Sequence, residues 1–311
     1  MNICATMKVG ALFKLVFHKG NPEKPTKQTD WFHNLVLNAG LDRLSVGRAD
    51  SQLNIGSGNS TPAITQTNLD SFMAASTTVQ TQASGRNFDN PSQPYYWIRR
   101  TYRFNAGVGT GTIAELGLGW SNTNCFNRTL VKDSGGNPTT ITKLSDEYLD
   151  VLTETRVYPQ PNISGSFNLL DKTNTLVSSH TYTGKVLLNQ DPNATGQIGQ
   201  VGFSYATGAF FIADLNIVDD YTTAVAGSVI SGATGITEYP TARSCKGTVT
   251  LPIGIATGIH KAFQFRFTNL VLAGPSSQVI GYKWQISPTI NKLSTWEMQY
   301  SFTITWDRYT P

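Results

Sequence analysis

Hydrophobic and polar residues alternate along much of this chain, and the clearest example lies near its C-terminal end. In the stretch 295–307, every second residue is large and apolar, and polar or charged residues stand between them. The apolar positions are Trp296, Met298, Tyr300, Phe302, Ile304 and Trp306. A period of two predicts a strand with one buried face and does not fit the period of a helix. Because a shift by one residue would expose all six side chains, we expect a firmly set register.

The same alternation recurs elsewhere along the chain. In 9–17 the apolar residues Val9, Ala11, Phe13, Leu15 and Phe17 fall on one face of a predicted strand. The stretches 262–273 and 279–287 also alternate, and the Gly- and Pro-containing residues 274–278 between them are typical of a hairpin loop. We therefore predict that 262–273, 279–287 and 295–307 form a three-stranded antiparallel meander.

The N-terminal half is more mixed. Leucines in 30–47 recur near helical spacing, but Gly40 interrupts them, so two short helical turns are expected there. Thr61 is a candidate N-cap followed by Pro62 at a first helical position, which predicts a short helix or turn. The side chains expected to point inward from this segment are Leu69, Phe72 and Met73. The stretch 95–104 returns to a period of two.

No stretch from residue 160 onward has the pattern of a long helix, and Gly and Pro bound most of the alternating segments. The fold class that this predicts is mainly β, with antiparallel β-sandwich domains and a few short helices in the N-terminal half. Residues 156–165 contain two prolines and mark the expected domain boundary. We therefore predict a β-rich N-terminal domain over 1–157 and an antiparallel β-sandwich over 158–311.

The composition favours a protein that packs against other subunits. Charged residues make up 14% of the 311 residues, against about 25% in an average globular protein. A surface of Thr, Ser, Asn and Gly avoids the roughly 1.5–2 kcal/mol needed to immobilise each Lys or Glu side chain. The net charge is +4, and the basic residues are scattered rather than arranged in a stripe. We therefore expect no specific nucleic-acid partner.

The three cysteines and the apolar runs indicate where the chain folds. Cys4, Cys125 and Cys245 lie far apart, and their odd number with no C-x-x-C spacing favours neither a disulfide framework nor a zinc site. Reduced thiols are the expected state, as in a cytoplasm. Near the N-terminus no apolar run reaches the roughly 7–15 residues of a signal peptide. We expect no membrane insertion, because no stretch is long and apolar enough to span a bilayer.

Gly56-Ser57-Gly58 is the segment that most resembles a phosphate-binding turn. A dinucleotide fingerprint needs a third glycine at position 61, where this chain has Thr61, and no Gly-Lys-Ser/Thr follows for a P-loop. We interpret Gly56 and Gly58 as a structural turn at the end of a strand, chosen for backbone freedom. No cofactor is expected.

No set of residues has the spacing of a catalytic or metal site. The four histidines are far apart, and His18, at the end of a strand, is expected to be solvated. The densest acidic cluster comprises Asp146, Glu147, Asp150 and Glu154, which we expect on one exposed face, solvated or meeting a basic partner. Asp219 and Asp220 fit a turn or a weak cation site, and Glu115 is expected to pair with an arginine. We expect no catalytic residue and no metal ligand.

Four segments, in their order along the chain, resemble bacteriophage virion and tail structural proteins. They are "WFHNLVLNAGLDRL", "LNIGSGNSTPAITQTNL", "RTYRFNAGVGTGTIAELGLGW" and "NRTLVKDSGGNPTTITKLSDEYLDV", within residues 30–155. The resemblance rests on a strand ending in G-(S/T)-G, a Thr- and Pro-bearing loop, and a later I-x-E-(L/V)-G-(L/V)-G strand. The C-terminal half carries no such resemblance beyond a β-sandwich. The family brings no catalytic residues to this chain.

The resemblance implies a non-enzymatic structural component of a bacteriophage particle, made in the bacterial cytoplasm and located in the virion. A tail protein, at the tail tip, in a fibre or bound to an adaptor, is the leading interpretation. Domain 1–157 would then serve attachment or assembly. The alternatives are a head-decorating or minor capsid protein, and a polysaccharide-degrading or glycan-binding tail protein. The expected partners are other copies of the chain, other phage tail or head proteins, and a bacterial surface glycan or protein receptor.

Residues 91–103 are the expected contact surface. Tyr95, Tyr96 and Trp97 are adjacent, so alternation sends only part of them into the core. Arg99 and Arg103 share the parity of Trp97, and Tyr, Trp and Arg are enriched in interface hot spots. We therefore predict an interface that includes Tyr95, Tyr96, Trp97, Arg99 and Arg103.

Overall fold

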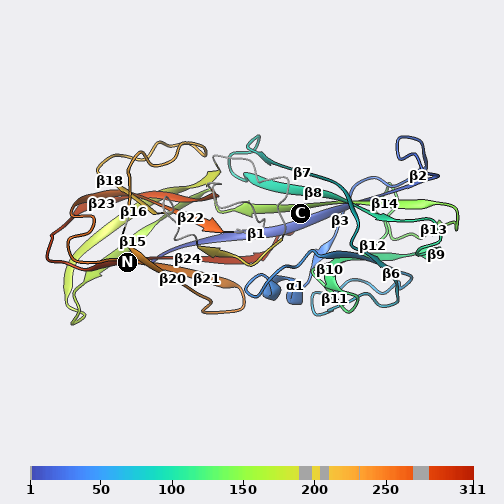
Figure 1. Cartoon of the computed structure of the whole chain (residues 1–311), viewed down its shortest axis with the longest axis horizontal. Coiled ribbons are helices and arrows are strands. Elements are labelled where there is room, and N and C mark those ends of the chain that lie inside the picture. Colours follow the sequence, from blue (N-terminus) through green and yellow to red (C-terminus); the bar gives the residue numbers. More distant parts are fainter. Residues whose placement is uncertain (1, 189–197, 204–209, 231, 269–279) are drawn as a thin grey trace.

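A computed structural model describes residues 2–188, 198–203, 210–230, 232–268 and 280–311. The chain is mainly β, as predicted, and its strands form several sheets along an elongated molecule (Figure 1). Strand β1 (Asn2–His18) runs through the middle of the molecule and connects its two ends. Its residues Val9, Ala11, Phe13, Leu15 and Phe17 are all buried, which confirms the predicted face.

A long sheet built around β1 joins the two ends of the chain. Its order is β20 (Thr234–Glu238), β21 (Ser244–Leu251), β24 (Met298–Arg308), β1, β14 (Tyr148–Pro159), β8 (Tyr95–Phe104) and β7 (Val79–Asn87). The short strands β2 (Pro25–Gln28) and β3 (Phe32–His33) also pair with β1. The pair β1–β24 is parallel, whereas β1–β14 is antiparallel. The first and last strands of the described chain are therefore neighbours.

A smaller sheet packs against one half of the long sheet. Its order is β4 (Leu35–Val36), β12 (Asn127–Leu130), β10 (Glu115–Ser121), β5 (Gln52–Gly56) and β6 (Phe72–Ser76), with β11 (Asn124–Cys125) beside β10. The strands β9 (Gly111–Ile113) and β13 (Ile141–Lys143) form a separate pair. Leu53, Leu116 and Leu118 of the smaller sheet share a core with Phe13 and Tyr102 of the long sheet.

A third sheet faces the other half of the long sheet. Its order is β15 (Asn162–Leu170), β16 (Leu176–Leu188), β23 (Ile280–Lys292), β22 (Gly258–Thr268), β18 (Phe210–Ala213) and β19 (Ser228–Val229), with β17 (Gly202–Phe203) beside β22. Phe302 of β24 meets the rings of Tyr282 and Trp284 on β23, with centroid distances of 5.2 and 5.5 Å. An aromatic core therefore lies between this sheet and the long sheet.

The predicted meander is wrong in one of its two pairings. Strands β22 and β23 pair antiparallel, as predicted, and the loop expected at 274–278 lies outside the described residues. Strand β24, however, pairs with β21 and β1 and belongs to the long sheet. The alternation of β24 fixed which face is buried, but it held no information about the neighbouring strand. From Met298 to Trp306 the predicted apolar face is buried, whereas Trp296 precedes the strand and is 37% exposed.

Helical structure is scarce in the described part of the chain. The six-residue helix α1 (Asn38–Arg43) lies within the stretch 30–47, where two helical turns were predicted. The segment after Thr61 contains turns rather than a helix. Of the side chains expected inward there, Leu69 is buried, but Phe72 at the start of β6 is 40% exposed.

The boundary predicted between 157 and 158 falls inside the last residues of β14. The chain then turns at Gln160 and Pro161 and enters β15. The long sheet takes β7, β8 and β14 from one side of this boundary and β20, β21 and β24 from the other. The division into two domains stays a prediction.

Candidate functional site

Strand β8 presents one face to the core and one to the surface. Tyr96, Ile98, Arg100, Tyr102 and Phe104 are buried, and the residues between them are half-buried or exposed. Of the predicted interface residues, Tyr95, Trp97, Arg99 and Arg103 therefore share the outward face. Tyr96 points the other way and is fully buried in the core, so it is not available for a contact.

Arg99 lies at the centre of this outward face, next to two tryptophans. Its guanidinium carbon is 5.2 Å from the ring centroids of both Trp31 and Trp97. The Arg99 Nε donates to Glu154 Oε2 at 3.0 Å, and the Glu154 side chain is only 5% exposed. Trp97 lies over Gly85 of β7, where a Cβ atom would be 2.7 Å from the indole. The sheet beneath it therefore holds the indole in place.

A second arginine extends this arrangement along β14. The Arg156 Nε donates to Glu154 Oε1 at 2.6 Å, so the buried Glu154 carboxylate joins both arginines. The Arg156 guanidinium lies 4.8 Å from the ring of Tyr95, which contacts Tyr158 at 5.2 Å. We call the set Trp31, Tyr95, Trp97, Arg99, Arg156 and Tyr158 the arginine–aromatic face. It carries two guanidiniums and one carboxylate, and is therefore basic.

Arg103 lies further along the same strand, in a separate ionic group. Its Nε and Nη2 atoms both donate to Asp150 at 2.7 Å, and these hydrogen bonds raise the pKa of Arg103. His18 Nε2 is 3.3 Å from the same carboxylate, and its Nδ1 accepts the Gly20 N–H. His18 is fully buried and stacked on Tyr148, so the expectation that it is solvated is wrong. The end of β1 is covered by β14, which sequence alone did not indicate.

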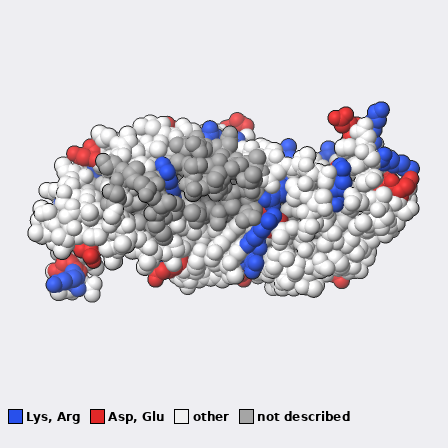
Figure 2. Space-filling model, viewed as in Figure 1, with Lys and Arg blue, Asp and Glu red and all other residues white. Residues whose placement is uncertain are grey.

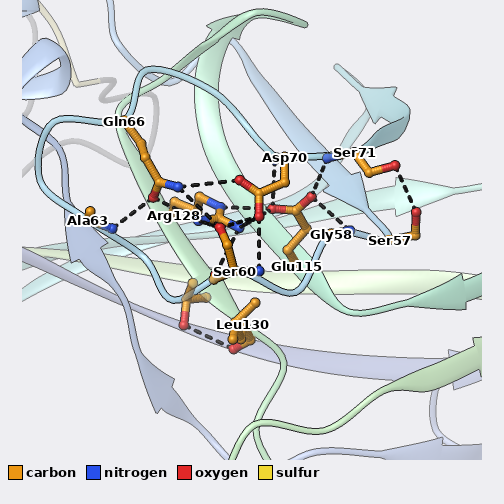
Figure 3. A network of polar contacts seen from close by, with 11 residues as sticks. Ser57, Gly58, Ser60, Ala63, Gln66, Asp70, Ser71, Glu115, Arg128 and Leu130 are labelled. Carbon is orange, nitrogen blue, oxygen red and sulfur yellow. Dashed lines mark hydrogen bonds and ion pairs between the residues drawn. The ribbon is translucent and has the colours of Figure 1, made fainter.

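The Gly56-Ser57-Gly58 turn meets the carboxylate of Glu115, and Figure 3 shows the contacts. Glu115 Oε1 accepts the Gly58 N–H at 3.0 Å and the Ser71 N–H at 2.8 Å, and Oε2 accepts the Asp70 N–H at 3.1 Å. Glu115 is fully buried in β10. Its carboxylate therefore holds both ends of the loop 57–71.

Arg128 of β12 completes this network from below the loop (Figure 3). Its guanidinium is fully buried and donates to Glu115 Oε2 at 2.8 Å, Asp70 Oδ2 at 2.7 Å and Gln66 Oε1 at 2.7 Å. Burial alone would raise the pKa of Asp70, but hydrogen bonds from Ser60 and the charge of Arg128 lower it. The pairing of Glu115 with an arginine is confirmed.

Close approach, rather than a special backbone conformation, accounts for the two glycines of the turn. Neither Gly56 nor Gly58 has a positive φ. A Cβ atom at Gly56 would lie 2.7 Å from Glu115 Oε1, and one at Gly58 would collide with Glu115 and Asp70. The backbone donors of this turn point at a carboxylate that the chain itself supplies.

The predicted acidic cluster does not form one exposed face, because Asp146 and Glu147 precede β14 and the two acids within the strand, Asp150 and Glu154, are covered by arginines of β8. Asp146 is exposed and pairs with Lys19, whereas Glu147, Asp150 and Glu154 are buried, so one exposed acidic face does not form. Burial would raise the pKa of Glu147. Hydrogen bonds from the Leu144 N–H, Lys27 and Thr26 nevertheless lower it to about 2. Each of these four acids pairs with a basic side chain, which agrees with the expectation that they are solvated or meet a basic partner.

Asp219 and Asp220 also meet lysines. Lys185 Nζ is 2.6 Å from Asp219, and the buried Lys283 Nζ is 2.9 Å from Asp220. Burial would raise the pKa of Asp220, but the hydrogen bonds from Lys283 and Thr223 lower it. The Asp220 carboxylate thus forms an ion pair with the buried Lys283.

A pocket of about 460 Å³ contains a histidine with both ring nitrogens in use. The pocket lies beside β18 and the start of β22 and is lined by Ile212, Ile230 and Ile259. His260 Nε2 meets the Ala256 carbonyl at 2.6 Å, and Nδ1 meets the Tyr300 hydroxyl at 2.6 Å. Burial lowers the pKa of His260. The ring is therefore a neutral bridge between β22 and β24.

The thiols and acidic groups of the described chain form no cluster for metal binding. Within the described ranges, no group of three His, Cys, Asp or Glu side chains could hold a metal ion. Cys4 is exposed, Cys125 and Cys245 are buried, and all three are free thiols. No helix in the described residues is long and apolar enough to cross a membrane. No family model, curated protein or solved structure matches the chain.

Sequence reasoning did not single out Trp31, Arg156 and Arg128 as members of these sites, and it named Glu154 only within the acidic cluster. Trp31 and Arg156 belong to the arginine–aromatic face, Glu154 joins its two arginines, and Arg128 holds the loop 57–71. The parity of β14 was a usable signal for Glu154 and Arg156, because residues two positions apart in a strand lie on the same face. Trp31 lies outside any strand, so no periodic pattern marks it.

Proposed function

We propose that the chain is a non-enzymatic structural component of a bacteriophage particle, belonging to the tail at its tip, in a fibre or on an adaptor. In this proposal it oligomerises and contacts the host surface, and the sheets that face one another form β-sandwiches. The Glu115–Arg128 network is the observation that carries the proposal. Its hydrogen bonds and ion pairs connect the segments whose order along the chain resembles virion proteins.

The network explains why those segments would occur together. The turn with Gly58 and the loop residue Gln66 come from the second segment, Glu115 from the third and Arg128 from the fourth. A buried arginine and a buried carboxylate each need the other, because an unpaired buried charge is costly. The Glu115–Arg128 pair is therefore stable only where β10, β12 and the loop 57–71 are all present. This interdependence supports a shared fold with the proteins that the ordered segments resemble.

The surface of the molecule supports an assembly role. Figure 2 shows one face on which uncharged residues cover most of the area, with Lys and Arg side chains grouped near its middle and again at its right-hand end. The arginine–aromatic face offers half-buried rings and guanidiniums held in fixed positions by Glu154. Pre-positioned Trp, Tyr and Arg side chains lose little entropy on binding, and they are enriched in hot spots.

Localisation in purified particles tests this proposal. Virions are separated from soluble lysate on a density gradient and labelled with a gold-conjugated antibody against the chain. We expect labelling on the tail at defined positions. A chain found only in the soluble fraction would overturn the virion assignment, and labelling of the head would favour the decorating or minor capsid alternative.

A glycan-binding tail protein is a second candidate that the arginine–aromatic face favours. Flat aromatic rings with adjacent guanidinium donors can stack on a sugar and donate to its hydroxyl groups. Purified protein is mixed with host capsule or lipopolysaccharide, and both binding and released reducing sugar are measured. Binding without sugar release supports a glycan-binding role. Release that disappears in Asp146→Asn or Glu147→Gln would show a polysaccharide-degrading enzyme instead.

A further inference from the structure

Strand β15 is the outermost strand of the third sheet, and from Asn162 to Leu169 it lacks the features that usually protect a sheet edge, since its pairing with β16 becomes irregular only between Leu169 and Leu170. Among the described strands, only β16 pairs with it. Natural edge strands are blunted by charges, prolines, bulges or short length. Residues 162–170 contain no charged residue and no proline, and form a nine-residue strand at the left-hand end of the molecule (Figure 1).

The hydrogen-bonding parity of β15 shows which groups face outward. The Val186 N–H donates to the Pro161 carbonyl, so residues 161 and 186 form a hydrogen-bonded pair of the antiparallel ladder. Such pairs alternate with non-bonded ones, so the odd-numbered residues of β15 bond to β16. The N–H and C=O groups of Ser164 and Ser166 therefore point away from the sheet. The Asn162 carbonyl agrees with this parity, because it accepts from the Gln160 side chain instead of β16.

The sequence of β15 is symmetric about Gly165. It reads Asn162-Ile163-Ser164-Gly165-Ser166-Phe167-Asn168, so each residue type on one side has a similar partner on the other. If two copies of β15 lie antiparallel with a two-fold axis at Gly165, Ser164 of each copy faces Ser166 of the other. Ile163 of each copy likewise faces Phe167 of the other. Ser164 and Ser166 are exposed, whereas Ile163 and Phe167 face the core. Like residues thus meet like residues on both faces.

The symmetric register also matches the parity of the outward groups. Ser164 and Ser166 have even numbers, so in this register they form two hydrogen-bonded pairs across the axis. Gly165 then faces its own counterpart in a non-bonded pair, where Cα atoms approach to about 4.5 Å. Gly165 is exposed, and the Tyr182 ring of β16 lies 2.9 Å from where its Cβ would be, so glycine leaves room for this ring at the centre of the pair. If the register shifted by one residue, N–H and C=O groups that already bond to β16 would have to face the second copy.

We propose that β15 pairs with β15 of a second copy of this chain, antiparallel about Gly165, and joins two third sheets into one continuous sheet. The occupant is a second copy because the strand is complementary to itself in sequence, parity and lack of charge. The inference does not depend on a role in a phage particle, and it concerns a different surface from the arginine–aromatic face.

Two charge variants at exposed positions test both the contact and its register. Ser164→Lys with Ser166→Lys places lysine opposite lysine twice across the axis. Ser164→Lys with Ser166→Glu places lysine opposite glutamate twice. Sedimentation velocity over a dilution series measures the mass of the full chain. We expect a dimer for the natural chain, a monomer for the lysine–lysine variant, and a dimer again for the lysine–glutamate variant.

A matched control separates register-specific repulsion from added charge. Thr181→Lys with Thr183→Lys adds the same charge at exposed positions on β16, directly beside Ser166 and Ser164. We expect this variant to remain dimeric, with circular dichroism unchanged in all variants. A monomeric natural chain at every concentration would overturn the proposal. Equal masses for the two Ser164/Ser166 variants would overturn it as well.

Discussion

At the scale of single residues, Arg128 belongs to a fully buried ion pair in the N-terminal half. Its guanidinium is fully buried, and it is the charged partner of the equally buried Glu115. Removing one partner of a buried ion pair costs about 3–5 kcal/mol, because the other charge stays buried without compensation. We therefore predict that Arg128→Met lowers the free energy of unfolding by about 3–5 kcal/mol, measured by urea denaturation.

Arg243 supplies the matched control for this prediction. It pairs with Asp42 at 2.6 Å, but both side chains are substantially exposed. Exposed ion pairs contribute about 0–1 kcal/mol, so Arg243→Met should change the free energy of unfolding little. Similar losses for Arg128→Met and Arg243→Met would contradict the role assigned to the Glu115–Arg128 network.

The pKa of Glu147 gives the fold a defined sensitivity to acid. Its pKa in the folded chain is about 2, below the ordinary value of 4.5, so the unfolded chain binds more protons between these pH values. The contribution of Glu147 to stability is therefore complete above pH 4.5 and is lost as the pH falls towards 2. We predict that Glu147→Gln removes about 2 kcal/mol at neutral pH and much less near pH 2.

Thermal melting across this pH range measures the effect. The exposed Asp146 is the control, because its lowered pKa comes from a hydrogen bond with the solvent-exposed Lys19. Asp146→Asn should leave the pH profile close to that of the natural chain, most of all in high salt. A Glu147→Gln profile parallel to the natural one would show that Glu147 does not contribute through its charge.

At the scale of the strand, Phe302 joins the long sheet to the third sheet. It is fully buried and contacts rings from β17, β22 and β23. Truncating a buried phenylalanine costs about 3–5 kcal/mol. We predict a loss of this size for Phe302→Ala and less than about 1 kcal/mol for the outward-facing Thr303→Ala, by chemical denaturation. Equal losses would contradict the assigned faces of β24.

The faces of strands could be predicted from the sequence, but the neighbours of strands could not. Alternation correctly assigned the buried residues of β1 and most of β24, because the side-chain period of a strand is two, whereas for β8 it gave the period and left Tyr96 on the wrong face. It gave no indication that β24 lies parallel to β1, since pairing depends on residues about 300 positions apart. The meander failed for this reason.

For the candidate sites too, the sequence predicted which residues share a face of a strand, but not which residues of other elements they contact. Parity placed Trp97 and Arg99 on one face, and their contact of 5.2 Å follows from positions two residues apart. Trp31 and Arg156 reach Arg99 and Tyr95 only because other elements pack against β8. His18 was misjudged as solvated because its cover, the β14 residue Tyr148, is 130 positions away in the chain.

At the scale of the whole molecule, the long sheet connects surfaces that lie far apart. Strand β1 pairs through its middle and end with β14, which pairs with β8 on its other side, and through its beginning with β24. The arginine–aromatic face lies over β8 and β14 of this sheet, whereas β15 belongs to the third sheet, whose residues Ile163 and Phe167 share a core with the long sheet, so packing rather than sheet pairing links the two proposed contact surfaces.

The arginine–aromatic face is the surface whose loss should impair assembly without unfolding the chain. Trp97 and Arg99 are partly exposed in the isolated chain, and hot-spot side chains of these types contribute 2 kcal/mol or more, roughly a thirtyfold change in affinity. We predict that Trp97→Ala and Arg99→Ala each lower incorporation into particles by about tenfold or more.

Quantitative immunoblotting of gradient-purified particles measures this incorporation, and melting temperature confirms that each variant is folded. Lys24→Glu, at an exposed position between β1 and β2, is the control for a changed surface charge and should be incorporated normally. Since the contact would desolvate Trp97, the segment 91–103 should also lose solvent accessibility in the particle. Full incorporation of both face variants, with 91–103 solvated on every copy, would exclude this face as an assembly contact.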